Sequence, residues 1–415
     1  MGNFNDISPL NESYTSGNMV AYYSLIPLVI ASFSYGNNDV YQYIFRIGGI
    51  SLFFVMLSTA KISLNRRYLL KVYISPVAWV ILYYVVISVY SASLAVNPLL
   101  GYWKSFEVLC VFFYILFIAN IRQTNKINDI LYIDVFKNVT MIILLTSILL
   151  KFIITGVSID KISGYFPIIN PNTVGTLSLI LSIIYFYKKS FLLGALFFLI
   201  MILSGSKTNI VALMLIFIIF LFHYKKYGYS KWITRLTILT IFGLIMVFIY
   251  PVYEEIYLYG GDYEKLSKLS GRLLMWELVN DLSDSGYFYS KIFYGDGIGA
   301  SRYLYLVTDG INHSVSMHNA WLEIILSAGL VACLWMFGVT LYSGKILFSY
   351  VKNRFHMALF LIFIVIFTRS FTSSNLSSIM PEMIFFYIIA QHAFILKKRD
   401  RNAKKTRMEK GIKNV

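Results

Sequence analysis

The chain alternates between long apolar runs and short polar connections. A transmembrane helix needs roughly 20 mostly apolar residues, and the apolar runs predict about twelve such helices. Their centres lie near residues 27, 50, 82, 111, 146, 178, 198, 215, 242, 332, 362 and 388. The pattern predicts an all-α membrane protein, in which residues 1–415 form a single polytopic bundle of about 12 transmembrane helices.

Composition supports the same class. Hydrophobic residues make up 58% of the chain and charged residues 13%, with a mean hydropathy of +0.68. Soluble domains carry about 25% charged residues. Cys110 and Cys333 both lie in predicted helices, so we expect neither a disulfide framework nor a thiolate metal site. The first apolar run lacks a basic segment before it and a small-residue cleavage site after it, so no cleavable signal peptide is expected.

Basic residues occur in every second connection between the predicted helices. These are Lys61, Arg66, Arg67 and Lys71; Arg122, Lys126 and Lys137; Lys188 and Lys189; Lys225, Lys226, Lys231 and Arg235; Lys345, Lys352 and Arg354; and the tail at 397–415. Short basic loops favour the cytoplasm, so we expect a multi-pass protein with a cytoplasmic C-terminus. The formal net charge of +16 then reflects topology and attraction to the membrane surface rather than nucleic-acid binding. The tail is predicted to be a solvated cytoplasmic anchor.

One long polar loop, residues 253–317, falls outside the cytoplasm in this topology, as do the positions near Lys104, Asn170, Lys207 and Arg369. Within it, residues 262–282 have apolar positions at helical spacing and predict an amphipathic helix. Three alternating glycines at 295, 297 and 299 predict a tight turn, since a dinucleotide site needs a strand before it and a helix after it. No ATP is supplied outside the cytoplasm. An enzyme there must use an activated substrate, such as a glycan on a polyprenyl pyrophosphate.

Ionisable residues at membrane depth are costly and are functional candidates by default. Lys207, Arg272 and Arg369 are suited to binding phosphate oxygens, Arg through two parallel hydrogen bonds and Lys as a point charge. The structural alternative is a set of ion pairs, such as Lys104 with Glu107, and a snorkelling side chain for Arg272. Arg46 and Glu382 belong to the same group of membrane-depth charges.

His318 and Asn319 stand where the long loop meets a predicted helix, and His313 lies five residues earlier. A neutral His titrates near working pH, so His318 is a candidate base or anchor for a substrate hydroxyl. The alternative is a helix cap. We find no HExxH pattern and no Cys partner, so no metal site and no cofactor are expected.

Three segments resemble the O-antigen polymerase and O-antigen ligase superfamily of bacterial inner membranes. They are SGSKTNIVAL (204–213), SGRLLMWELVNDL (270–282) followed by YGDGIG (294–299), and HNAWLEIILSAGL (318–330). PIINPNTVG (167–175), which contains Asn172, is similar to an Asn-Pro-Asn stretch of the family. Lys207 stands where the family more often has Arg.

The resemblance implies a metal-independent glycosyltransferase of the polytopic GT-C type. In it, His318 and Arg272 are catalytic, and Lys207, Arg369, Asn319, His313 and Asn172 bind the pyrophosphate or glycan. The implied partners are an undecaprenyl-pyrophosphate-linked oligosaccharide, membrane lipids and a chain-length regulator protein.

We expect a surface-polysaccharide polymerase that transfers a growing glycan from undecaprenyl pyrophosphate to a lipid-linked repeat unit. Richness in Ile, Tyr, Phe and Asn favours the polymerase over the rival ligase, which transfers glycan to lipid A-core. A flippase for the same lipid-linked units is the alternative from another class. It predicts internal repeats or helices broken at the bilayer midplane.

Overall fold

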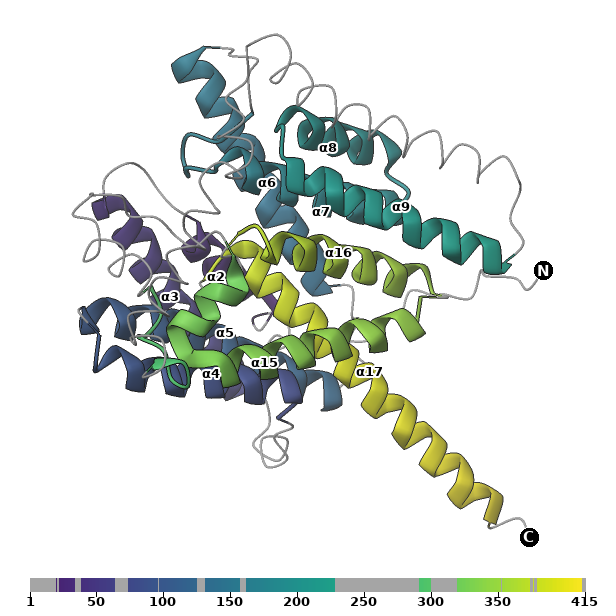
Figure 1. The fold of residues 1–415 in the computed structure, drawn as a ribbon. Helices are drawn as coiled ribbons and strands as arrows, with labels where there is room; N and C mark the ends of the chain where they lie inside the picture. The colour runs from purple at the N-terminus through teal and green to yellow at the C-terminus, as the bar shows by residue number, and fades with distance from the viewer. Residues whose placement is uncertain are drawn as a thin grey trace.

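The computed structural model describes residues 20, 22–33, 39–63, 74–95, 97–124, 131–156, 162–227, 291–299, 319–351, 353–373, 376 and 379–412. Within these residues the chain is helical and contains no strand (Figure 1). The helices are α2 (Leu25–Ser32), α3 (Asp39–Ser63), α4 (Pro76–Ala92), α5 (Pro98–Thr124), α6 (Leu131–Thr155), α7 (Pro171–Tyr187), α8 (Phe191–Leu203), α9 (Lys207–Tyr227), α15 (Ala320–Ser349), α16 (Arg354–Ser370) and α17 (Pro381–Ile412).

Each described helix contains one centre predicted from the apolar runs, so the helices at these positions are confirmed. The centre near residue 242 lies outside the described residues. In the part of the chain that the structure describes, four helical segments are long and apolar enough to cross a membrane: Val40–Thr59, Pro98–Phe117, Tyr132–Thr155 and Ala320–Ser349. Transmembrane character is therefore supported, while the full number of spans stays a prediction.

Several helices begin at a capped proline. Ser75 caps α4 by accepting a hydrogen bond from the Ala78 N–H, and Asn170 caps α7 in the same way through the Thr173 N–H. Proline suits the first helical position because its missing N–H would have no acceptor there. A polar residue before Pro therefore fixes where these helices begin.

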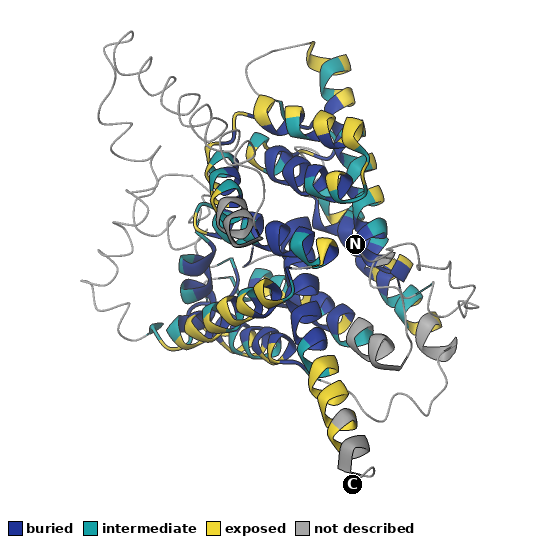
Figure 2. Cartoon of the chain, turned by 90° about the vertical axis from the view of Figure 1, so that its right-hand side faces the viewer, coloured by how far each residue is buried: buried dark blue, intermediate teal, exposed yellow. Residues whose placement is uncertain are grey.

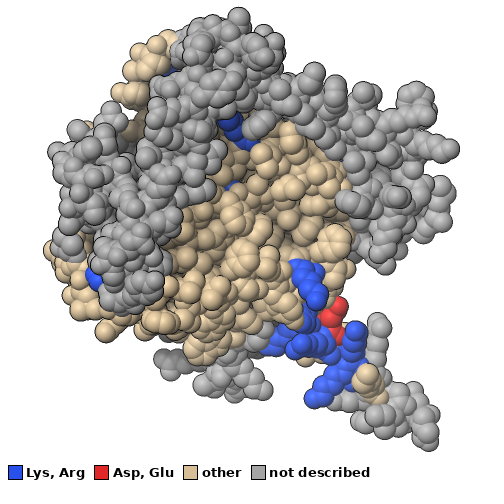
Figure 3. All heavy atoms as spheres, viewed as in Figure 1, with Lys and Arg blue, Asp and Glu red and all other residues tan. Residues whose placement is uncertain are grey.

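The first half of α17 is the centre of the bundle. Residues 382–396 are buried, and the helix packs against α15, α16, α4, α5 and α2. Phe385 stacks on Phe136 of α6 with ring centroids 4.1 Å apart. Beyond Lys398 the same helix leaves the bundle and becomes exposed (Figure 2). Lys and Arg gather along this extension (Figure 3), which corresponds to the basic tail predicted at 397–415.

Helix α15 is broken at Gly329, whose φ of 83° and ψ of 171° are not helical. The turn sets a short first segment at a sharp angle to the long second one (Figure 1). A run of turns at Lys291–Gly299, called the hairpin below, packs into the break. The Asp296 N–H donates to the Leu326 carbonyl at 2.7 Å, and the Leu330 N–H donates to the Ile292 carbonyl at 2.6 Å. Backbone groups freed by the break are thus satisfied by the hairpin.

The hairpin needs its glycines. Gly295, Gly297 and Gly299 have positive φ, which confirms the predicted tight turn. A Cβ on Gly295 would lie 2.6 Å from backbone atoms of α15. The rest of the predicted loop 253–317, including the amphipathic helix at 262–282, lies outside the described residues.

Helices α7, α9 and α16 pack against one another. The first residues of α7 and α9 and the last residues of α16 come together at one end of the bundle. This agrees with the sequence topology, which placed Asn170, Lys207 and Arg369 on one side of the membrane.

Candidate functional site

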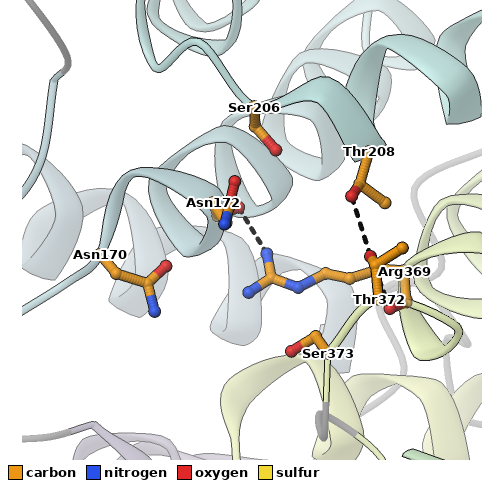
Figure 4. Close-up of a pocket in the computed structure, with 7 residues that line it drawn as sticks. All are labelled: Asn170, Asn172, Ser206, Thr208, Arg369, Thr372 and Ser373. Atoms are coloured by element: carbon orange, nitrogen blue, oxygen red, sulfur yellow. Dashed lines mark hydrogen bonds between the residues drawn. The ribbon is translucent and has the colours of Figure 1, made fainter. Parts of the chain in front are cut away.

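A small polar pocket lies where the first turns of α7 and α9 meet the end of α16 (Figure 4). Its lining residues are Asn170, Asn172, Ser206, Thr208, Arg369, Thr372 and Ser373. The cavity volume is about 60 Å³, several times the roughly 10–15 Å³ that one water needs. Every lining side chain can form hydrogen bonds and the single charge among them is positive, so the pocket suits a small polar or anionic group.

Arg369 is the cationic lining residue and is only 3% exposed. Its Nη1 donates to the Asn172 carbonyl and to the Thr176 hydroxyl, and its Nη2 donates to Thr173 Oγ1 at 2.8 Å. These acceptors all belong to the first two turns of α7. Arg369 therefore ties the end of α16 to the start of α7 while its guanidinium faces the pocket.

Glu382, the second residue of α17, is fully buried beside Arg369. Its Oε1 lies 3.4 Å from Arg369 Nη1. Among the described residues, neither carboxylate oxygen accepts a hydrogen bond, and Arg369 Nε donates none. A buried ion needs a partner, so Arg369 is the cation that compensates this carboxylate. The pair joins α17 to the pocket.

Two helix N-termini converge on the pocket. Asn170 precedes α7, and Ser206 precedes α9 and accepts a hydrogen bond from the Asn209 N–H at 3.1 Å through its carbonyl. Each N-terminus carries about half a positive charge, and such ends bind phosphate. The buried Ser206 hydroxyl lines the pocket and has no hydrogen-bond partner in the described part of the chain. The pocket thus combines positive potential with an uncommitted donor.

Helices α7 and α9 approach so closely here because residue 175 is a glycine. A Cβ on Gly175 would lie 2.4 Å from Ser204 Oγ and 2.5 Å from Asn209 Nδ2. Asn209 is fully buried, and its Oδ1 lies 2.8 Å from the Thr176 hydroxyl. On the α9 side, Thr208 Oγ1 lies 2.8 Å from Thr372 Oγ1 (Figure 4). Side-chain hydrogen bonds therefore connect all three helices around the pocket.

The structure brings some of the predicted site residues together and leaves others apart. Arg369 and Asn172 share the pocket, Asn172 through its carbonyl. Lys207 is the first residue of α9, but its side chain is exposed and does not line the pocket. Arg272, His313 and His318 lie outside the described residues.

Asn319 is the N-cap of α15. Its Oδ1 accepts hydrogen bonds from the Trp321 N–H at 2.9 Å and the Leu322 N–H at 3.2 Å. Trp321 Nε1 in turn donates to Ser370 Oγ at 2.9 Å, next to Arg369. The start of α15 therefore lies near the pocket, and the cap accounts for the Asn319 side-chain oxygen without a substrate.

Sequence reasoning missed five lining residues: Asn170, Ser206, Thr208, Thr372 and Ser373. Asn170 had a usable signal, because Asn before Pro marks a helix start. Ser206 and Thr208 flank Lys207, whose charge is the stronger signal in this segment. Small hydroxyl residues such as Thr372 and Ser373 carry no signal of their own in a membrane protein.

The predicted structural pair of Lys104 and Glu107 is confirmed. Glu107 is fully buried in α5, with Lys104 Nζ 2.9 Å from Oε2 and Arg46 Nη1 3.0 Å from Oε1. Trp103 Nε1 also donates to Oε1 at 2.8 Å. Arg46 therefore bridges α3 to α5, and these charges stabilise contacts between helices.

The hairpin in the α15 break carries a second buried carboxylate. Asp296 is 5% exposed and accepts a hydrogen bond from Lys291 Nζ. Burial raises the pKa of Asp296 from 3.8 to about 6 and lowers the pKa of Lys291. Within the described residues, no group of three or more His, Cys, Asp or Glu side chains is placed to hold a metal ion.

No protein-family model matches the chain, and the search of curated proteins found no match to it.

Proposed function

We propose that the protein is a surface-polysaccharide polymerase of the O-antigen polymerase type in the bacterial inner membrane. It transfers a growing glycan from undecaprenyl pyrophosphate to a lipid-linked repeat unit at the periplasmic face. The observation that carries this proposal is the pocket around Arg369, at one end of a helical bundle with membrane-crossing segments. The resemblance of segments 204–213, 270–282 and 318–330 to the O-antigen superfamily supports it.

The pocket suits the leaving group of this reaction. A phosphate-sized anion would meet the N-termini of α7 and α9, the Ser206 hydroxyl and the Arg369 guanidinium. Positive groups fixed before the reaction stabilise the charge that develops on the departing pyrophosphate. The cavity is too small for an oligosaccharide, so the glycan and the polyprenyl chain lie outside it.

The transfer itself exchanges one bond for another. The acceptor hydroxyl oxygen bonds to the anomeric carbon, and the bond from that carbon to the pyrophosphate oxygen breaks. The hydroxyl proton passes to a base, for which His318 is our candidate, and undecaprenyl pyrophosphate leaves with the electron pair. Arg272 adds a second cation for the pyrophosphate. Complete charge compensation is expected to need both arginines, because Glu382 offsets much of the Arg369 charge.

A transporter of lipid-linked units is the second candidate, and the break in α15 would favour it if the break lay at the bilayer midplane. Transporter sites are built where helices break near the bilayer midplane. Here the segment after the break, Leu330–Ser349, is about 30 Å long at 1.5 Å per residue and is long enough to cross the hydrocarbon core by itself. The break then lies near the membrane surface, which supports the enzyme.

The test is a complementation experiment. A strain lacking the gene receives wild type, Arg369→Lys or Arg354→Lys, and its surface polysaccharide is separated on a gel. Arg354→Lys is the matched control, since Arg354 is exposed at the opposite end of α16. We expect Arg369→Lys to lose long chains and keep the band with one repeat unit, with equal protein in the membrane. An unchanged ladder would remove the pocket from the reaction.

An assay with purified protein distinguishes the polymerase, ligase and transporter activities. Lipid-linked repeat units in vesicles are incubated with the protein, with or without lipid A-core. Longer lipid-linked glycans support the polymerase, and glycan on lipid A-core without longer lipid-linked products supports the ligase. Movement of units across the bilayer without either product supports the transporter.

A further inference from the structure

A second charged cluster lies at the opposite end of α7 from the pocket. Asp134, in the first turn of α6, accepts a hydrogen bond from Lys188, which directly follows α7. Lys137 Nζ lies 3.4 Å from the same Asp134 oxygen. Two connections that the sequence topology placed in the cytoplasm therefore meet at one point. We name Lys137, Lys188, Lys189 and Asp134 the lysine cluster.

Counted over the residues that the structure describes, the lysine cluster has excess positive charge. Lys137 and Lys188 share one carboxylate, and Lys189 adds a third ammonium group. The side chains of Lys137 and Lys188 are partly buried, 13% and 26% exposed, and the side chain of Lys189 is exposed. Partly desolvated cations attract an anion more strongly than fully solvated ones.

The backbone holds Lys189 at the surface. Its φ of 62° is in the left-handed region, and the following Ser190 N–H donates to the Tyr185 carbonyl at 2.9 Å. This closes a tight turn between α7 and α8 with the Lys189 side chain exposed. Tyr185 also faces the cluster, with Lys137 Nζ 5.3 Å from its ring centre. The ammonium groups of Lys137 and Lys188 are therefore placed by the start of α6 and the end of α7, and the turn places the backbone of Lys189 next to them.

Apolar surface extends from the lysine cluster along α6. Asp134 stands at the head of a stripe at helical spacing, which continues through Ile142, Leu149 and Ile153, 57%, 57% and 78% exposed. At 1.5 Å per residue, Ile142 lies about 12 Å from Asp134 and so within the leaflet next to the lysines, and Ile153 lies about 28 Å away in the other leaflet. On the other side, α8 begins next to Lys189 with Phe191 and Leu192, which are 66% and 85% exposed. An amphiphile could thus place an anionic head on the lysines and acyl chains on α6 and α8.

We propose that the lysine cluster binds the phosphate of an anionic phospholipid in the cytoplasmic leaflet. Basic sites between helix ends on the cytoplasmic side recognise such headgroups. The charge surplus matches a phosphate, and the exposed apolar stripe matches acyl chains rather than a soluble anion. This site is separate from the Arg369 pocket and does not depend on the proposed glycan transfer.

Full-length protein is purified and equilibrated with vesicles that contain phosphatidylcholine alone or mixed with phosphatidylglycerol. Native mass spectrometry then counts the phosphatidylglycerol molecules retained. Lys137→Gln/Lys188→Gln is expected to lower the affinity for phosphatidylglycerol about 30-fold, since each lysine near a lipid surface contributes about a factor of five. Lys404→Gln/Lys405→Gln removes the same charge from the exposed part of α17 and is expected to change the affinity less than twofold.

Asp134→Asn distinguishes a lipid site from a structural ion pair. It frees both lysines from their carboxylate, so lipid affinity is expected to rise, whereas a merely structural cluster would lose stability and gain no lipid. Glycerol 3-phosphate, added as a soluble competitor, is expected to leave the lipid bound. Equal retention by the wild type and the lysine variant would overturn the proposal. Displacement by glycerol 3-phosphate would overturn the lipid assignment and indicate a site for soluble phosphates.

Discussion

The two ends of α7 handle charge in opposite ways. At its start, Arg369 and Glu382 are a buried pair, and the guanidinium donates to a backbone carbonyl and to hydroxyl groups of α7. At its end, about 25 Å away at 1.5 Å per residue, Lys137 and Lys188 share a partly exposed Asp134. At the buried end, Glu382 balances the charge of Arg369, whose guanidinium is held by hydrogen bonds to α7 and lines the pocket. The exposed end has surplus charge that remains available to a ligand.

The first prediction tests the buried end. Arg369→Met leaves Glu382 as an uncompensated buried carboxylate, and loss of one partner of such a pair costs about 3–5 kcal/mol. We expect this loss in equilibrium unfolding in mixed micelles. Arg354→Met, on the same helix but exposed, is expected to change the unfolding free energy by less than about 0.5 kcal/mol.

The double variant Arg369→Met/Glu382→Gln sharpens this prediction. Glu382→Gln removes the uncompensated buried carboxylate, so we expect the double variant to recover a large part of the unfolding free energy that Arg369→Met loses. If the double variant is as unstable as Arg369→Met, the hydrogen bonds of Arg369 to α7 outweigh its pairing with Glu382.

The second prediction concerns Asp296, in the hairpin on the same side as the pocket. Its pKa is raised from 3.8 to about 6, so the folded protein prefers the protonated form. Its contribution to stability is complete at low pH and decreases as pH rises through about 6. Each pKa unit corresponds to about 1.4 kcal/mol, so the change is at most about 3 kcal/mol.

Asp296→Asn removes this titration. The melting temperature of the wild type minus that of Asp296→Asn is expected to fall between pH 4 and about 6 and then stay constant. A rise in this difference over the same pH interval would mean that the ion pair with Lys291 lowers the pKa of Asp296 more than burial raises it.

The third prediction tests the close approach of α7 and α9. Gly175→Ala places a Cβ within 2.5 Å of Ser204 Oγ and Asn209 Nδ2, so these buried groups must shift from their positions between the helices. Overpacking of this kind costs about 1–3 kcal/mol. Gly338→Ala is the control, since no atom lies within 4 Å of its Cβ position. We expect Gly175→Ala alone to lower the midpoint of unfolding in mixed micelles and to shorten the glycan chains.

The smallest effect is expected at the lysine cluster. Lys188→Gln breaks a partly exposed pair, and such pairs contribute about 0–1 kcal/mol. The loss in unfolding free energy, measured in detergent without anionic lipid, should shrink further at high salt. A loss as large as that of Arg369→Met would make the two ends alike and contradict the comparison.

Much of the fold follows from the sequence because helix positions depend on local apolar runs. The sequence topology also predicted that Asn170 and Arg369 lie on one side of the membrane, and in the structure both line the same pocket. It could not identify Glu382 as the partner of Arg369, because the pairing depends on how α16 and α17 pack. Nor could it predict the break at Gly329, since glycine is common within transmembrane helices. Lys207 shows the limit of prediction for single residues. Its neighbours Ser206 and Thr208 line the pocket, but the Lys207 side chain is exposed.

The hairpin at Lys291–Gly299 has a consequence for the length of the chain around it. Its backbone hydrogen bonds to Leu326 and Leu330 fix one point of the chain between α9 and α15 against the bundle. The number of residues from Gly299 to the start of α15 therefore sets how far the chain can extend from this point, independently of the number of residues between α9 and Lys291.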